Sequence, residues 1–191
     1  LQDIRFSHNY LYFFDKLERA NQYLDDVIEL KDRDLDDRLN RNVVFYAADD
    51  GAWWTTFQRL VSKYGIVPEY AYPDSKNVSR TNDLIDNLDK RLKIAAKDIR
   101  DAFKDGRESE IECIKEKAMK DVYRINAISL GVPPKRFDLC VKDKDNKLIE
   151  RRNISPIEFY NEFFKEDVSE YVELGNYPGK KNDPCGSVQI T

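Results

Sequence analysis

The chain has 191 residues, of which 36% are charged and 41% hydrophobic, and its 32 basic residues nearly balance 36 acidic ones. This length is enough for a buried core without disulfides, and the charge balance argues against nucleic acid or an anionic membrane as a partner. No apolar run approaches the length of a membrane span. The single histidine, His8, excludes sites that need two histidines from one chain, and so most zinc hydrolases.

The first part of the chain predicts three helices. Ser7 is a good N-cap for a helix to about Leu30. Its apolar side chains recur at helical spacing at Tyr10, Phe13, Phe14, Leu17, Leu24, Val27 and Ile28. A second, shorter helix is indicated by Leu35, Leu39, Val43 and Tyr46. A third is expected from Ala52 to about Tyr64, ending at Gly65.

Residues 79–130 predict an antiparallel helical hairpin with charged outer faces. Its first apolar stripe consists of Leu84, Leu88, Leu92, Ala95, Ile99 and Phe103, and its second of Ile111, Ile114, Ala118, Val122 and Ile125. Residues 104–107 interrupt the stripe between them.

The remainder predicts a short β-hairpin and a last helix. Alternation at Phe137, Leu139 and Val141, followed by a turn at 143–146, indicates the hairpin. Ser155 and the following proline are typical of a helix start. We expect residues 175–186 to form a polar loop and residues 187–191 to begin a strand. The predicted fold class is mainly α with minor β.

Few residues offer chemistry. His8 lies at a helix start, without a motif nearby that it could activate, so we expect a structural role. Residues 143–147 resemble the opening of a calcium loop but lack its later ligands, which favours a hairpin turn. Cys113, Cys140 and Cys185 form no CxxC pair and are expected to be free thiols in a reducing compartment.

The turn formed by Asp50, Gly51 and Ala52 leaves two interpretations open. Small residues there would let another backbone approach closely, so that an extended peptide could pair with the main chain. The alternative is an ordinary connection between two helices. Residue chemistry alone does not decide between them.

The order of several segments resembles the bleomycin hydrolase and aminopeptidase C family of papain-like cysteine peptidases. These segments are residues 6–21, 35–38, 50–51, 63–69, 72–75, 130–138, 143–146 and 155–160. The resemblance implies an α+β parent protein, of which this chain holds a helical papain-like subdomain. Residues 1–75 would follow the active-site helix, 76–135 would be a helical insertion, and 136–191 would hold the β-hairpin, a short helix and the next strand region.

The resemblance also implies that this chain carries no catalytic residue. The family's nucleophilic cysteine and oxyanion-hole glutamine would precede Leu1, and its catalytic histidine and asparagine would follow Thr191. Both ends of the chain therefore look like cuts through a longer protein. The family's Asp-Gly-Gly corresponds to Asp50, Gly51 and Ala52, which are the expected substrate-binding residues. No metal or other cofactor is implied.

Two functions follow as expectations. The first is part of a cysteine aminopeptidase that releases amino-terminal residues of peptides through a Cys thioester, with the chain alone inactive. The second is a non-catalytic helical module for protein interaction or oligomerisation. The resemblance implies a peptide substrate and a homo-oligomer, a hexamer in the family, and we expect a cytoplasmic location.

Overall fold

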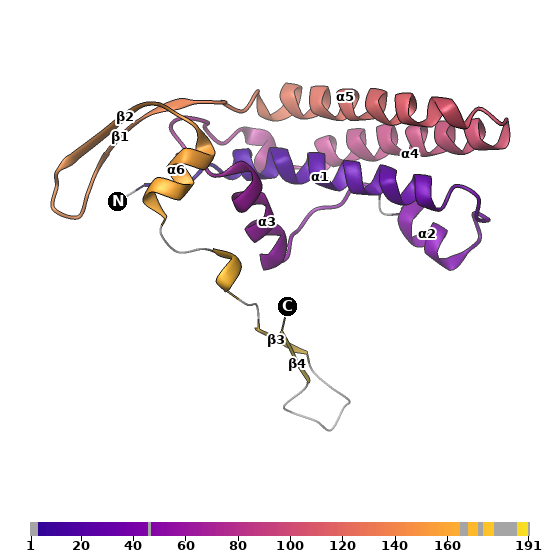
Figure 1. The fold of residues 1–191 in the computed structure, drawn as a ribbon, viewed down its shortest axis with the longest axis horizontal. Helices are drawn as coiled ribbons and strands as arrows, with labels where there is room; N and C mark the ends of the chain where they lie inside the picture. Colours follow the sequence, from indigo (N-terminus) through magenta and orange to yellow (C-terminus); the bar gives the residue numbers. More distant parts are fainter. Residues whose placement is uncertain (1–3, 46, 165–167, 172–173, 178–186, 191) are drawn as a thin grey trace. The chain divides into compact units, whose positions relative to one another are not determined.

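The computed structural model describes residues 4–45, 47–164, 168–171, 174–177 and 187–190 (Figure 1). The chain divides into two compact units. The bundle unit consists of residues 7–51 and 69–134, and the strand unit consists of residues 1–6, 52–68 and 135–191. Each unit is made of segments far apart in the sequence. Among the described residues, no helix combines the length and the apolar character needed to cross a membrane.

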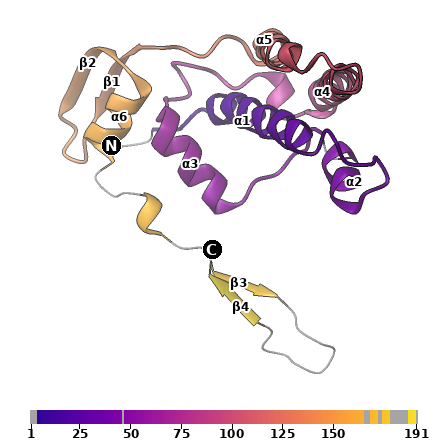
Figure 2. The same cartoon turned by 45° about the vertical axis from the view of Figure 1, so that its right-hand side comes forward.

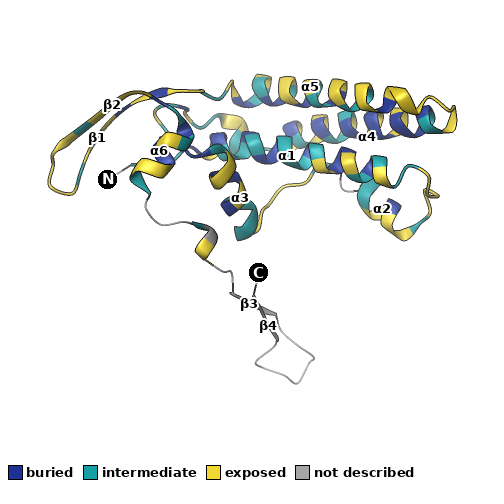
Figure 3. Cartoon of the chain, in the orientation of Figure 1, coloured by how far each residue is buried: buried dark blue, intermediate teal, exposed yellow. Residues whose placement is uncertain are grey.

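The bundle unit is built on three long helices that run side by side, as Figures 1 and 2 show. They are α1 (His8–Glu29), α4 (Asn82–Lys104) and α5 (Ile111–Leu130), accompanied by α2 (Arg38–Phe45) and the 3-10 turns η1 (Lys76–Val78) and η2 (Glu108–Glu110). Their buried faces turn toward one another and their exposed faces turn outward (Figure 3). The core includes Phe13, Leu24, Val27, Leu88, Leu92, Ile99 and Val122.

Local signals place these helices where the sequence predicts them. The Ser7 hydroxyl accepts a hydrogen bond from the Tyr10 amide at 3.1 Å and so caps α1. The expected second helix is present as α2, although Tyr46 lies outside the described residues. The helical hairpin is confirmed as α4 and α5, whose apolar stripes face each other and α1.

Arg100 of α4 binds the C-terminal end of α1. Its side chain is almost fully buried and donates to the carbonyl oxygens of Leu30 at 3.1 Å, Lys31 at 3.4 Å and Arg33 at 3.1 Å. It also donates to the amide oxygen of Asn40. The Leu30 carbonyl also accepts the Arg33 amide at 3.1 Å, and the Arg33 carbonyl also accepts the Asn40 side-chain amide at 3.0 Å. The guanidinium thus completes a hydrogen-bond network just after α1 and complements the negative end of the helix dipole.

In the described part of the strand unit there are two antiparallel strand pairs and two α-helices. Its elements are α3 (Trp54–Tyr64), β1 (Phe137–Lys142), β2 (Leu148–Ile154), α6 (Pro156–Phe163), η3 (Val168–Glu170), β3 (Leu174–Tyr177) and β4 (Ser187–Ile190). β1 pairs with β2, and β3 with β4. The fold class is therefore mainly α with minor β, as predicted. Ser155 and Glu158 form a capping box at the start of α6, which confirms the expected helix start.

Gly65 lets the end of α3 approach the start of α6 closely. It ends α3 at φ +73° and donates its amide to the Val61 carbonyl at 2.8 Å. A Cβ at this position would lie 2.3 Å from the carbonyl carbon and from the oxygen of Pro156. Glycine is thus required here both by the backbone conformation and by the packing.

Two expectations need correction. The third helix begins at Trp54 rather than Ala52, because Trp53 has extended backbone angles and occupies the N-cap position. Residues 175–177, expected as loop, belong to β3, because their backbone pairs with β4. The expected strand start at 187–190 is confirmed as β4, whereas residues 178–186 lie outside the described residues.

Candidate functional site

The turn that follows α2 is exposed and has an open side. Asp50, Gly51 and Ala52 are all exposed, and Gly51 adopts φ +97°. A Cβ added at Gly51 would meet no atom within 4 Å. The positive φ explains why glycine stands at this position, and the open space is what the approach of another backbone needs.

A buried lysine on α1 holds the turn. Lys16 is 3% exposed, and its Nζ donates to the Asp49 carbonyl at 2.8 Å and to the Asp50 carboxylate at 3.3 Å. The same ammonium contacts the Asp15 carboxylate at 2.9 Å and lies 4.4 Å from the centre of the Tyr12 ring. A buried cation is tolerated only with partners of this kind, so Lys16 ties the turn firmly to α1.

Arg19 binds the other side of the same turn. Its Nε donates to both Asp15 oxygens, at 2.8 and 3.0 Å, and its Nη2 donates to the Gly51 carbonyl. Asp15 therefore lies between two cations, one bound to the Asp49 carbonyl and one bound to the Gly51 carbonyl. Asp15 is itself only 6% exposed, so the centre of this network is shielded from water, whereas the Arg19 side chain is 31% exposed.

Asp50 stays ionised within this network. Partial burial acts to raise its pKa, but the hydrogen bond with Thr81 and the charge of Lys16 outweigh burial and hold the pKa below its ordinary value. The carboxylate also accepts the Gly51 amide at 3.2 Å. A charged Asp50 thus fixes the conformation of the turn from within.

His8 pairs with an aspartate instead of a thiol. Its Nδ1 lies 2.9 Å from the Asp74 carboxylate, which also accepts the Asn9 amide at 2.9 Å. Burial acts to raise the pKa of Asp74, but these two hydrogen bonds outweigh it and lower the pKa. The imidazole is 84% exposed. The pair joins the start of α1 to the segment before η1, in line with the structural role expected for His8.

The other candidates do not gather into a site. Cys113 lies exposed on α5 and Cys140 lies exposed on β1, while Cys185 is outside the described residues. Asp143 accepts the amides of Asp145 at 2.8 Å and Lys147 at 2.9 Å. In a calcium loop the Asp143 carboxylate would bind the ion. Here it closes the turn between β1 and β2 instead, as expected.

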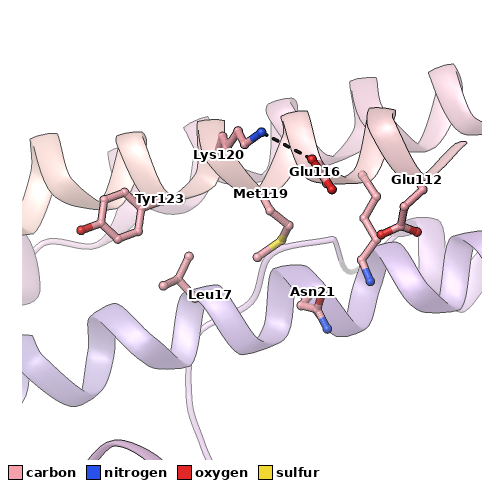
Figure 4. Close-up of a pocket in the computed structure, with 8 residues that line it drawn as sticks. Leu17, Asn21, Glu112, Glu116, Met119, Lys120 and Tyr123 are labelled. Atoms are coloured by element: carbon pink, nitrogen blue, oxygen red, sulfur yellow. Dashed lines mark hydrogen bonds and ion pairs between the residues drawn. The ribbon is translucent and has the colours of Figure 1, made fainter. Parts of the chain in front are cut away.

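A shallow groove of about 510 Å³ runs between α1 and α5. Figure 4 shows Leu17 and Asn21 of α1 facing α5 across it, with Met119 and Tyr123 of α5 on the other side. Charged side chains of α5, including Glu116 and Lys120, border the groove (Figure 4). The groove is therefore apolar at its base and charged at its rim.

The sequence did not reveal the network beneath the turn. Asp15 and Arg19 have the i, i+4 spacing of a helical ion pair, which is a detectable signal. Nothing local indicates that Lys16 is buried or that the two cations reach carbonyls more than 30 positions away, at Asp49 and Gly51.

Comparison with known proteins identifies the class to which this fold belongs. Residues 1–190 match the model of the Peptidase C1-like family, so the chain belongs to that family. The resemblance to the bleomycin hydrolase and aminopeptidase C group of papain-like peptidases is confirmed.

Particular relatives are aminopeptidases of bacteria. Aminopeptidase G of Lactobacillus delbrueckii subsp. lactis is 39% identical over 90% of this chain and 39% of its own length. Aminopeptidase C of Listeria innocua is 35% identical over 94% of this chain and 40% of its own length. The crystal structure of PepW from Lactobacillus rhamnosis HN001 superposes with a TM-score of 0.85 at 29% identity, covering 96% of this chain and 41% of that one. The chain thus spans about two fifths of these relatives.

Proposed function

We propose that this chain is part of a cysteine aminopeptidase and supplies a substrate-binding turn to it. The observation that carries the proposal is the match to aminopeptidases along at least nine tenths of the chain. The complete enzyme would release amino-terminal residues of peptides. We place it in the cytoplasm, where its cysteines would remain reduced.

The chemistry proposed for the complete enzyme is acyl transfer. A thiolate attacks the carbonyl carbon of the peptide bond, the amine leaves with a proton, and water then hydrolyses the thioester. This needs a cysteine within hydrogen-bond reach of a histidine. His8 is hydrogen-bonded to Asp74, and Cys113 and Cys140 lie on an outer helix face and a strand. Cys185 lies outside the described residues. On the resemblance to the family, we propose that nucleophile and base lie outside this chain, which would be inactive alone.

The turn at Asp50, Gly51 and Ala52 is the proposed contact with the substrate. Its support is the exposure of all three residues, the open space at Gly51 and the rigid attachment to α1. An extended peptide would pair with the main chain there, as in other cases where a peptide binds along exposed backbone. Neither a metal nor a cofactor takes part in this proposal.

Replacing Gly51 by alanine tests the turn in the complete protein. Alanine at φ +97° is strained, and the strain favours other turn conformations. We expect KM for an aminoacyl amide to rise about fivefold, which corresponds to roughly 1 kcal/mol of backbone strain, while kcat stays unchanged.

The matched control is Gly106→Ala. Gly106 has φ +72° and the same open surroundings, but it lies in the loop between α4 and α5. This variant should lose similar stability and keep its KM. Equal KM values for both variants and the parent would contradict a role of the turn in substrate binding.

A second function, self-association through α5, is favoured by the groove and the charges beside it. One exposed face of α5 carries four charged residues at helical spacing. Glu112 and Glu116 lie in its first half, and Lys120 and Arg124 lie in its second half. In an antiparallel pair of α5 helices, Glu112 would face Arg124 and Glu116 would face Lys120. Such a self-complementary surface is what a twofold interface requires, and the occupant proposed for the groove is a second copy of the chain.

Charge exchange tests this pairing by sedimentation equilibrium of the purified chain. The parent should dimerise, Glu116→Lys should weaken the dimer by placing like charges opposite each other, and the double variant Glu116→Lys with Lys120→Glu should restore it. A monomeric parent, or a double variant no better than the single one, would refute the proposed interface.

A further inference from the structure

Two carbonyls at the substrate turn, one just before it and one within it, are each bound by a different cation of α1. Lys16 binds the Asp49 oxygen at 2.8 Å, and Arg19 binds the Gly51 oxygen. Asp15 holds both cations in place, at 2.9 Å from Lys16 and 2.8 Å from Arg19. One turn of α1 thus fixes the direction of the main chain on both sides of Asp50.

This arrangement leaves a defined part of the turn for a ligand. The Gly51 carbonyl is bound by Arg19, and the Gly51 amide donates to Asp50 at 3.2 Å. Within the described part of the chain, the amide and carbonyl of Ala52 have no hydrogen-bond partner, and the residue is exposed. The Asp50 amide donates to the Asp49 carboxylate at 2.7 Å. Ala52 is therefore the residue of the turn whose amide and carbonyl are both available to pair with a peptide.

We infer that Arg19 and Lys16 are positioning residues for the peptide substrate, which act by fixing the Asp49 and Gly51 carbonyls so that the Ala52 main chain is presented to it. The inference rests on the proposed function of the turn. It adds that two side chains of α1 set the affinity of the turn for the peptide.

Arg19 is the better residue to vary, because its side chain is 31% exposed whereas that of Lys16 is 2% exposed. Arg19→Met keeps the aliphatic stem and removes the donors. In the complete protein, KM for an aminoacyl amide should rise about tenfold, the size expected for one hydrogen bond to a charged group, with kcat unchanged. Arg19→Lys keeps one cation but cannot bind Asp15 and Gly51 as a fork does, so its KM should be intermediate.

The control is Arg41→Met, which removes an exposed arginine of α2 and should leave both constants unchanged. A general loss of structure would lower kcat and the melting temperature instead of raising KM alone. If Arg19→Met does not fold, the KM of Arg19→Lys tests the inference instead. A parental KM in whichever variant folds, or a change confined to kcat, overturns the inference. A parent protein without aminoacyl-amide hydrolysis would instead refute the proposed function.

Discussion

Replacing Gly65 by alanine is expected to destabilise the chain by about 3–5 kcal/mol, the sum of an overpacked contact and a strained backbone. The new Cβ would lie 2.3 Å from the carbonyl carbon and oxygen of Pro156 and 2.5 Å from the Ile157 nitrogen. These are backbone atoms at the start of α6, which cannot move aside as a flexible side chain can. Urea unfolding followed by circular dichroism measures the loss.

Gly106→Ala separates the two causes. Gly106 has φ +72°, nearly the same as the +73° of Gly65, but a Cβ there would meet nothing within 4 Å. This control should lose only the backbone contribution of about 1 kcal/mol. If both variants lost the same free energy of unfolding, the close approach of α3 and α6 would not contribute to stability.

Arg100→Met is expected to cost about 3 kcal/mol, because it removes a buried, charged donor that binds four acceptors. The Lys31 carbonyl and the amide oxygen of Asn40 would lose their donor. The Leu30 and Arg33 carbonyls would each keep one other donor. Methionine retains much of the aliphatic stem, so the measured loss would come mainly from the hydrogen bonds. The same unfolding experiment reports it.

Lys97→Met is the matched control on α4. Lys97 is an exposed residue of the same helix, paired with Asp101 one turn further on. An exposed pair of this kind contributes little, so the variant should unfold almost as the parent does. An Arg100→Met variant as stable as this control would contradict the role given to Arg100 at the end of α1.

The sequence was most informative where structure is set by neighbours in the chain. Ser7 before α1, Gly65 after α3, and Ser155 with Pro156 before α6 all act through local hydrogen bonds or backbone conformation. Such signals need only a few residues, and helical spacing of apolar side chains adds the face that will be buried. The helices and the β-hairpin were therefore predictable.

What could not be predicted depends on residues brought together by folding. Arg100 reaches carbonyls about 70 positions away, and His8 meets Asp74 across 66 positions. Lys16 is a charged residue of α1, yet it is buried under the turn. Neither helical periodicity nor a capping residue indicates these contacts. The small residues and the family resemblance were enough to name the turn as a candidate site. Its attachment to α1 could not be predicted from the sequence.

We propose that this chain carries a substrate-binding turn of a cysteine aminopeptidase whose nucleophile lies elsewhere in the polypeptide. The most direct measurement is aminoacyl-amide hydrolysis by the complete protein with Cys113, Cys140 and Cys185 all replaced by serine. We expect this variant to remain active and still to be inactivated by iodoacetamide, because the reactive thiol is none of the three. Loss of hydrolysis in a folded triple variant, or turnover by the isolated 191-residue chain, would contradict it.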